Sequence, residues 1–112
     1  MLNLTTVASL DEALGSRSPV VLFKHSTRCP ISAAADAEYR GFVGRQPKAG
    51  TFTHLDLIAH RDVSNAIAAR LGVVHESPQL IIVRGGRVSA VLNHDAITGD
   101  ALAALLKGRS EF

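Results

Sequence analysis

The sequence predicts a single α/β domain with a mixed central sheet of about four to five strands and helices on both faces. Two observations predict it. Short apolar runs rich in β-branched residues alternate with helix-forming stretches over the first two thirds of the chain, which is typical of parallel strands joined by helices. Two further apolar runs flank Arg84–Arg87, whose central Gly-Gly is a strong hairpin signal. At 112 residues the chain can bury one core, so we expect one domain over residues 1–112.

The first half of the chain is expected to alternate strand and helix. In order, we predict a strand over Leu4 to Val7, a helix from Ser9 to near Gly15, a strand over Val20 to Phe23 and a helix from Pro30 to about Val43. Ser9 followed by Glu12 resembles a capping box at a helix start. Pro30 suits the first helical position, where its missing N–H costs nothing, and the residues after it are rich in alanine.

The second half continues this alternation and ends in a hairpin and a helix. In order, we predict a strand over Thr51 to Leu57, a helix over Val63 to Leu71, strands over Gln79 to Val83 and Val88 to Leu92, and a helix over Asp95 to Lys107. Val63, Ile67 and Leu71 share one helix face, and Gly72 follows as a C-terminal cap. The last helix should bury Leu102, Leu105 and Leu106. The resulting order, with two crossovers before an antiparallel hairpin, is thioredoxin-like.

Cys29, the only cysteine, lies at the expected junction between a buried strand and a helix. Free N–H groups and the positive end of the helix dipole stabilise an anion at such a position. Lys24, His25 and Arg28 precede it in what we expect to be a cationic loop, and they should add positive potential. The alternative is a buried structural cysteine, but that role requires none of these flanking residues. We therefore interpret Cys29 as a reactive thiol.

The segment Cys29-Pro30-Ile31-Ser32 has the form of a C-x-x-C redox motif with serine in the second place. Because the chain has no other cysteine, any disulfide it forms must join Cys29 to another molecule. Ser32 lies one helical turn after Cys29 and is a candidate hydrogen-bond donor to the thiolate. It can equally be a helix residue without a chemical role.

Ser77 and Pro78 come directly before the third long strand. In a thioredoxin-like arrangement this loop lies beside the start of the helix that follows Cys29. Pro78 is a candidate for a cis peptide bond, although an ordinary trans proline is what the sequence alone favours. His75 is a further candidate for the groove beside Ser77.

Composition excludes several classes of function. The net charge is +2 with scattered cationic residues, and four Phe and one Tyr offer little for base stacking, so we expect no nucleic-acid partner. No apolar run approaches the roughly 20 residues of a membrane span and the N-terminus does not resemble a leader, so we expect a cytoplasmic protein without membrane contact. The spacing of His54, His60, His75 and His94 forms no compact ligand set, so we expect neither zinc nor a tightly bound cofactor. Asp56 could aid proton transfer but is more typical of a cap.

These motifs together resemble the YtxJ-like monothiol bacilliredoxin family of the bacillithiol system. The similar segments are His25-Ser26, Cys29 to Ser32, Leu55 to Ile58, Arg61 to Ile67, Gly72 to His75, Glu76 to Gln79, and His94 to Thr98. One departure is Asp95, where the family often has an aromatic residue after the histidine.

The resemblance implies a thioredoxin fold, a cis bond at Ser77-Pro78 and thiol-disulfide exchange through Cys29. It also implies bacillithiol as co-substrate and S-thiolated proteins as partners. The segment from Lys24 to Cys29 is similar to a glutaredoxin loop in which a lysine attracts the carboxylate of a thiol tripeptide, which makes Lys24 a candidate substrate-binding residue.

Two alternatives stay open. One is a non-catalytic thioredoxin-like binding or redox-sensor module, in which Cys29 is only a reversible oxidation mark. The other is a glutathione-dependent monothiol glutaredoxin that holds an iron–sulfur cluster through Cys29. That family has a TGG-like segment after its cis-proline strand, whereas Arg84-Gly85-Gly86 is expected to lie in the hairpin.

Overall fold

The structure is a computed structural model that describes residues 1–107. Its five strands form one sheet in the order β1-β3-β2-β4-β5. The strands are β1 (Leu2–Asn3), β2 (Val20–His25), β3 (Thr51–Asp56), β4 (Gln79–Arg84) and β5 (Arg87–Asn93). β1, β3 and β2 run parallel, β4 is antiparallel to β2, and β5 is antiparallel to β4. The predicted mixed sheet is confirmed.

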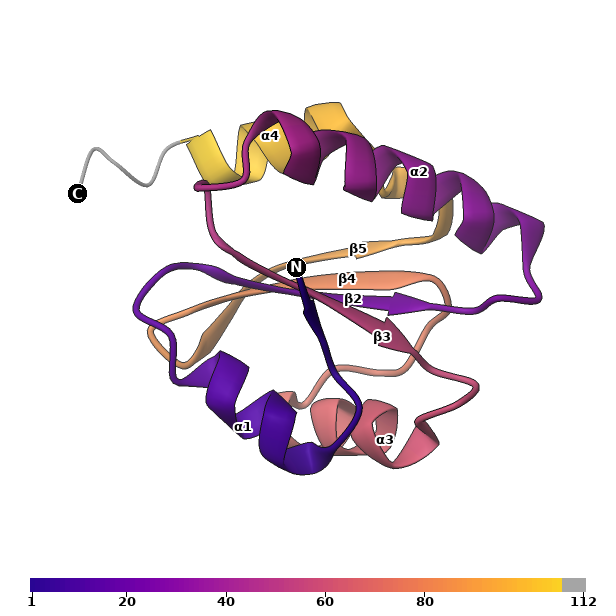
Figure 1. Ribbon diagram of the computed structural model, residues 1–112, viewed down its shortest axis with the longest axis vertical. Helices are drawn as coiled ribbons and strands as arrows, with labels where there is room; N and C mark the ends of the chain where they lie inside the picture. The colour runs from indigo at the N-terminus through magenta and orange to yellow at the C-terminus, as the bar shows by residue number, and fades with distance from the viewer. Residues whose placement is uncertain (108–112) are drawn as a thin grey trace.

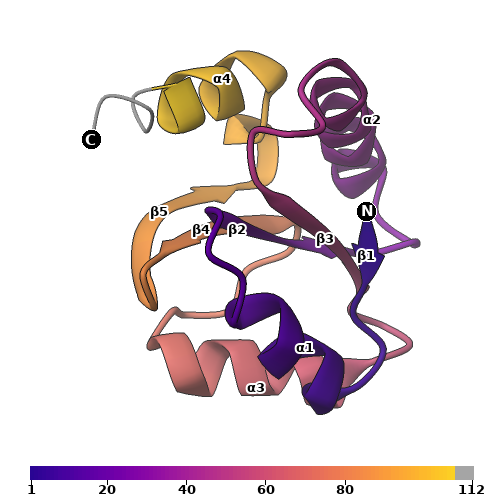
Figure 2. The same ribbon diagram turned by 60° about the vertical axis from the view of Figure 1, so that its left-hand side comes forward.

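Helices cover both faces of this sheet. They are α1 (Val7–Leu14), α2 (Pro30–Arg45), α3 (Arg61–Leu71) and α4 (Gly99–Lys107), with a short 3-10 turn, η1 (His94–Ala96), before α4. α2 and α4 lie side by side on one face, and α1 and α3 lie on the other (Figures 1 and 2). In the described part of the chain, no helix combines the length and the apolar character needed to span a membrane.

Alternate side chains of β2 pack into two separate hydrophobic cores, one on each face of the sheet. Val20 and Leu22 pack with α1 and α3, whereas Val21 and Phe23 pack with α2 and α4. Successive side chains of a strand point to opposite faces. The same alternation therefore directs Lys24 toward α3 and His25 toward α2.

The N-terminal boundaries predicted from the sequence were wrong by a few residues. The edge strand is Leu2–Asn3, and Leu4 is buried beyond it with its N–H donating to the His54 carbonyl at 2.9 Å. Thr6 caps α1: its Oγ1 accepts the Ser9 N–H at 3.0 Å, and Ser9 Oγ accepts the Thr6 N–H at 3.1 Å. This reciprocal pair satisfies two free donors, so Ser9 is the third helical residue and not the cap.

α2 ends at Arg45, close to the predicted end near Val43, and its glycines do not stop it earlier. It passes through Gly41 and Gly44 to Arg45 because its inner face supplies Tyr39 and Phe42 to the core. Burial energy of this kind outweighs the roughly 1 kcal/mol that a helical glycine costs relative to alanine. The buried Tyr39 hydroxyl also donates to the carbonyl of Thr53 at 2.5 Å, which ties α2 to β3.

The C-terminal helix also differs from the prediction in its start. α4 begins at Gly99, and residues 94–96 form η1 because the His94 N–H donates to the Pro78 carbonyl at 2.9 Å and holds this segment against the loop before β4. Leu102 and Leu106 are buried as expected, while Leu105 is only partly covered.

The hairpin prediction is confirmed. Gly85 and Gly86 have φ of 57° and 80°, and they form a two-residue turn between β4 and β5. Both positions lie in the left-handed region that suits a turn of the primed type, where a residue with a Cβ would be strained.

Candidate active site

Cys29 is the N-cap residue of α2 and is partly exposed. The chain leaves β2, turns at Ser26–Cys29 with a Cys29 N–H to Ser26 carbonyl bond of 3.3 Å, and enters the helix at Pro30. The first turn of α2 has no acidic residue. The 16-residue helix thus directs its free N–H groups toward the thiol without a competing carboxylate in that turn.

The cis-proline loop lies at the same edge of the sheet. Lys24 of β2 is directly opposite Gln79 of β4, so Pro78 is next to the carboxyl end of β2, from which the Cys29 turn begins. The Ser77-Pro78 bond is cis, which confirms what the family resemblance implied. Pro78 is buried and Ser77 is half-buried.

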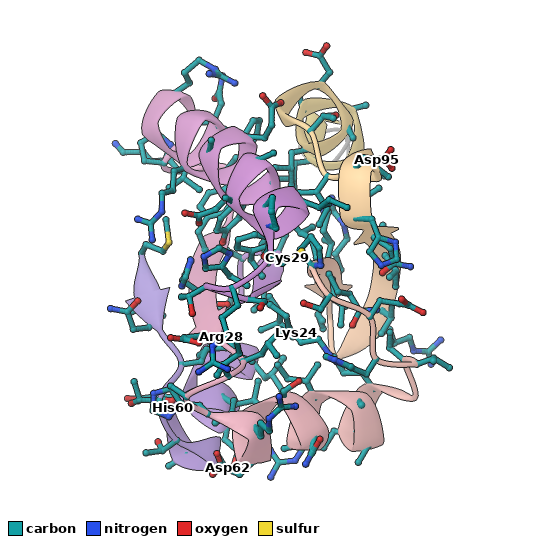
Figure 3. The ribbon with its side chains drawn as sticks, turned by 90° about the vertical axis from the view of Figure 1, so that its right-hand side faces the viewer. Lys24, Arg28, Cys29, His60, Asp62 and Asp95 are labelled. Atoms are coloured by element: carbon teal, nitrogen blue, oxygen red, sulfur yellow. The ribbon has the colours of Figure 1, made fainter. Side chains whose placement is uncertain are left out.

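A shallow groove of about 220 Å³ separates the start of α2 from the segment after β5. It is lined by Ile31, Ala34, Ala35, Glu38, His94, Asp95, Ile97 and Thr98. Figure 3 shows Asp95 across from the α2 end that carries Cys29. The side chains of His94 and Glu76 are in contact, with Nε2 to Oε1 at 3.1 Å, so the groove wall and the cis-proline loop are joined. A larger hollow of about 380 Å³ lies at the other end of α2, against Phe42 and Leu106, away from the thiol.

Ser32 is fully buried under the start of α2, and its hydroxyl is engaged by the preceding loop. Its Oγ accepts the Ser26 N–H at 2.9 Å and lies 2.8 Å from His25 Nδ1. Among the described residues, the hydrogen-bond partners of the Ser32 hydroxyl are His25 and Ser26, and the predicted bond to the Cys29 thiolate is not among them.

Lys24 is not part of an exposed cationic loop, and that expectation was wrong. β2 extends to His25, and Lys24 is fully buried on the α3 side of the sheet, well below Cys29 in Figure 3. Its Nζ donates to His75 Nδ1 at 2.9 Å, and Ser64 Oγ is 3.5 Å from the same nitrogen. Two of the four residues expected to bind substrate thus bind each other, and the buried ammonium has no exposed surface on which to receive a carboxylate.

Burial lowers the pKa of Lys24 to about 8. The pKa of His75 is lowered too, by burial of its ring and then by the neighbouring Lys24 charge. The neutral imidazole that this favours can accept a hydrogen bond from the lysine ammonium. Between pH 8 and the unfolded lysine pKa of about 10.4, the unfolded chain binds more protons than the folded one. The free energy of unfolding should therefore rise with pH in that window.

Lys24→Met should remove this rise. The stability difference between Lys24→Met and the parent should shrink by on the order of 3 kcal/mol from pH 7 to pH 10.5, because the cost of burying the ammonium disappears as the parent lysine loses its proton. Urea unfolding at both pH values measures it, and Lys48→Met at an exposed lysine is the matched control. Equal differences at the two pH values would contradict a buried ammonium.

The remaining candidates occupy different surroundings. Arg28 is exposed and lies on the His60 side of the loop in Figure 3. Asp56 caps the turn after β3, since its Oδ1 accepts the N–H groups of Ile58 and Ala59 at 3.1 and 3.3 Å. These two hydrogen bonds support a capping role for Asp56 over a role in proton transfer.

One cluster was not foreseen from the sequence. His25, Asp36 and His54 each offer one ligand atom, and these atoms all lie within 4.8 Å of one another. His54 Nε2 is 3.1 Å from Asp36 Oδ1, and burial lowers the pKa of His54 although the Asp36 hydrogen bond opposes it. The sequence argument compared only the spacing of His54, His60, His75 and His94, and it considered neither His25 nor Asp36 as a partner of His54.

The matched family model is that of the monothiol bacilliredoxin BrxC, and the match covers residues 2–102. The chain belongs to the monothiol bacilliredoxin family. The single cysteine at the start of α2 agrees with a one-thiol member of this family, and the family assigns the protein to thiol-disulfide redox chemistry.

Solved structures agree on the fold. A protein described as "A putative oxidoreductase with a thioredoxin fold" matches with a TM-score of 0.85 and 28% identity, over 93% of this chain and 91% of that one. Thioredoxin from Trypanosoma brucei brucei matches with a TM-score of 0.79 and 13% identity, over 100% and 92% of the two chains. Mitochondrial thioredoxin 3 from Saccharomyces cerevisiae matches with a TM-score of 0.76 and 14% identity, over 96% and 93%. The thioredoxin-like prediction is confirmed.

Proposed function

We propose that this bacilliredoxin-family protein removes bacillithiol from protein mixed disulfides, with Cys29 as the nucleophile. The observation that carries the proposal is the position of the single thiol, at the N-cap of α2 and at the same sheet edge as the cis-proline loop. A thiolate at a helix N-terminus is favoured as an anion and remains accessible to an incoming disulfide.

The exchange needs one thiol of this chain and two thiol molecules. The Cys29 thiolate attacks the bacillithiol sulfur of the mixed disulfide, a Cys29–bacillithiol bond forms, and the protein sulfur leaves as a thiolate that takes a proton from water. A second bacillithiol thiolate then attacks the capped Cys29 on the bacillithiol sulfur. This step releases bacillithiol disulfide and restores the Cys29 thiolate, so no further oxidant or reductant is consumed.

The surroundings of Cys29 suggest how a substrate protein would be held. An incoming backbone can pair with Ser77 at the cis-proline loop, and an apolar side chain fits the groove between Ile31 and Ile97. Arg28, the residue before Cys29, is exposed, and it is the cation that we propose for the co-substrate in place of the buried Lys24. S-thiolated proteins and bacillithiol are thus the proposed partners, in a reducing cytoplasm.

Parallel mass analysis tests the proposal. The reduced protein is exposed to bacillithiol disulfide and, separately, to glutathione disulfide, and each adduct is then offered the matching free thiol. We expect capping at Cys29 and release by bacillithiol, with several turnovers on a bacillithiolated substrate protein. Faster turnover with glutathione would indicate the glutaredoxin alternative, and capping without turnover would indicate a sensor.

A matched variant assigns the thiol-binding cation. Arg28→Gln should slow capping by bacillithiol disulfide several-fold, because it removes an exposed charge near the thiol, and the effect should weaken at high salt. Arg87→Gln, which removes an exposed arginine on the hairpin, should leave the rate unchanged. Equal rates for both variants would remove Arg28 from the binding role.

A further inference from the structure

We propose that His25, Asp36 and His54 form a binding site for a divalent transition-metal ion of the zinc class. The site is separate from the thiol of Cys29, and it stands or fails independently of the exchange reaction.

Three rigid elements bring the ligands together. His25 is the last residue of β2, His54 lies on the neighbouring strand β3, and Asp36 extends from α2 above them. His25 and His54 point to the α2 side of the sheet together, as shown by their ring-centroid distance of 5.3 Å. Ligands on strands and helices of one core are held more precisely than ligands on loops.

The spacing suits a small ion. Zinc bonds to imidazole nitrogen and carboxylate oxygen at about 2.0–2.2 Å, so two ligand atoms of a tetrahedral site lie about 3.3 Å apart. His54 Nε2 and Asp36 Oδ1 are already 3.1 Å apart, and the third ligand atom is within 4.8 Å of both. To reach this spacing the third ligand atom has to approach the other two by up to about 1.5 Å.

Donor chemistry selects the class of metal. Two imidazoles and one carboxylate suit zinc and its transition-metal neighbours, whereas magnesium and calcium prefer oxygen ligands. The side chains of His54 and Asp36 are 11% and 21% exposed, so an ion can enter and water can fill a remaining position. His25 Nδ1 is held by Ser32 Oγ at 2.8 Å, which leaves Nε2 for the metal and orients the ring as metal-bound histidines usually are.

Arg40 opposes metal binding, and it supplies a sharp test. Its Nε lies 2.9 and 3.1 Å from the two Asp36 oxygens, and its side chain is 55% exposed. An exposed ion pair of this kind contributes little to stability, so a metal ion can displace it. Removing Arg40 should therefore raise the metal affinity, an effect that loss of a merely structural pair would not produce.

Zinc titration against a competing chelator measures the affinity, in a Cys29→Ser background so that the thiol cannot bind metal. We expect one Zn²⁺ per chain. Asp36→Asn and His54→Gln should each weaken binding by at least about 10- to 100-fold. Arg40→Gln should strengthen it several-fold. His94→Gln is the matched control, since His94 forms another histidine–carboxylate pair with Glu76, and it should leave the affinity unchanged.

Spectroscopy on the Cys29→Ser protein, which keeps all three proposed ligands, tests the proposal even if a ligand variant does not fold. Co²⁺ bound to the Cys29→Ser protein should show d–d absorption that Zn²⁺ removes. The ring signals of His25 and His54 should shift with Zn²⁺, and those of His60 and His94 should not. The proposal is overturned if Asp36→Asn or His54→Gln binds zinc as the background protein does, or if the shifts fall on other histidines.

Discussion

Cys29→Ser is expected to reduce thiol-disulfide exchange to the uncatalysed rate, because serine cannot form the thiolate that attacks the disulfide. The folded state should not suffer. The Cys29 side chain makes no capping hydrogen bond, whereas serine is a preferred N-cap residue, so the free energy of unfolding should stay equal or rise by up to about 1 kcal/mol.

Two measurements on Cys29→Ser check that exchange is lost while stability is kept. Turnover of a bacillithiolated protein, followed by intact mass, reports exchange, and urea unfolding reports stability. Residual turnover above the uncatalysed rate would mean that another group carries the reaction. A large loss of stability would mean that Cys29 has a packing role that its position does not indicate.

Ser32→Cys is expected to convert the protein from a one-thiol to a two-thiol exchanger. Position 32 is the third residue of α2 and lies one helical turn after Cys29, so the new thiol is within reach of the old one. The bacillithiol adduct on Cys29 should become transient and be replaced by an internal disulfide, seen as the loss of two hydrogens. Some stability should be lost with it, because the Ser26 N–H loses its Ser32 acceptor.

Two controls isolate the geometry. Ala37→Cys adds a second thiol on the exposed side of the same helix, about 12 Å further along the axis, and should stay capped at Cys29 without an internal bond. Ser32→Ala removes the hydrogen bonds without adding a thiol. If Ser32→Cys behaves as Ala37→Cys does, then position 32 is not arranged as in a C-x-x-C motif.

Local patterns were sufficient for most of the fold. The β-branched run of β2, Pro30 at the start of α2 and the glycine pair of the hairpin each determine a local structure from a few neighbouring residues. The errors occurred where particular hydrogen bonds decide a boundary. The edge strand ends at Asn3 and α1 begins at Val7 because Thr6 and Ser9 form a reciprocal cap, and η1 replaces the expected start of α4 because His94 bonds to Pro78.

In the candidate site, too, local patterns could be predicted from the sequence and distant contacts could not. The position of Cys29 at the start of a helix could be predicted because a cysteine directly before Pro30 and a helix-forming stretch is a local arrangement. The environments of Lys24 and His25 could not, since β2 extends two residues beyond the apolar run and its alternation sends these neighbours to opposite faces. Lys24 then meets His75, far along the chain, and His25 meets Ser32, Asp36 and His54.

The sequence by itself determined the order of the elements, the single thiol and the exclusion of a disulfide within this chain, because each depends on residue type and short-range spacing. Only the tertiary structure decided which charged groups lie near the thiol and which polar side chains form hydrogen bonds with one another. The reason is physical: strand alternation and sheet order, not distance along the chain, set which side chains share a face. A lysine five residues before Cys29 is thus buried on the α3 side of the sheet, while an aspartate on α2 and a histidine on β3 meet beside His25.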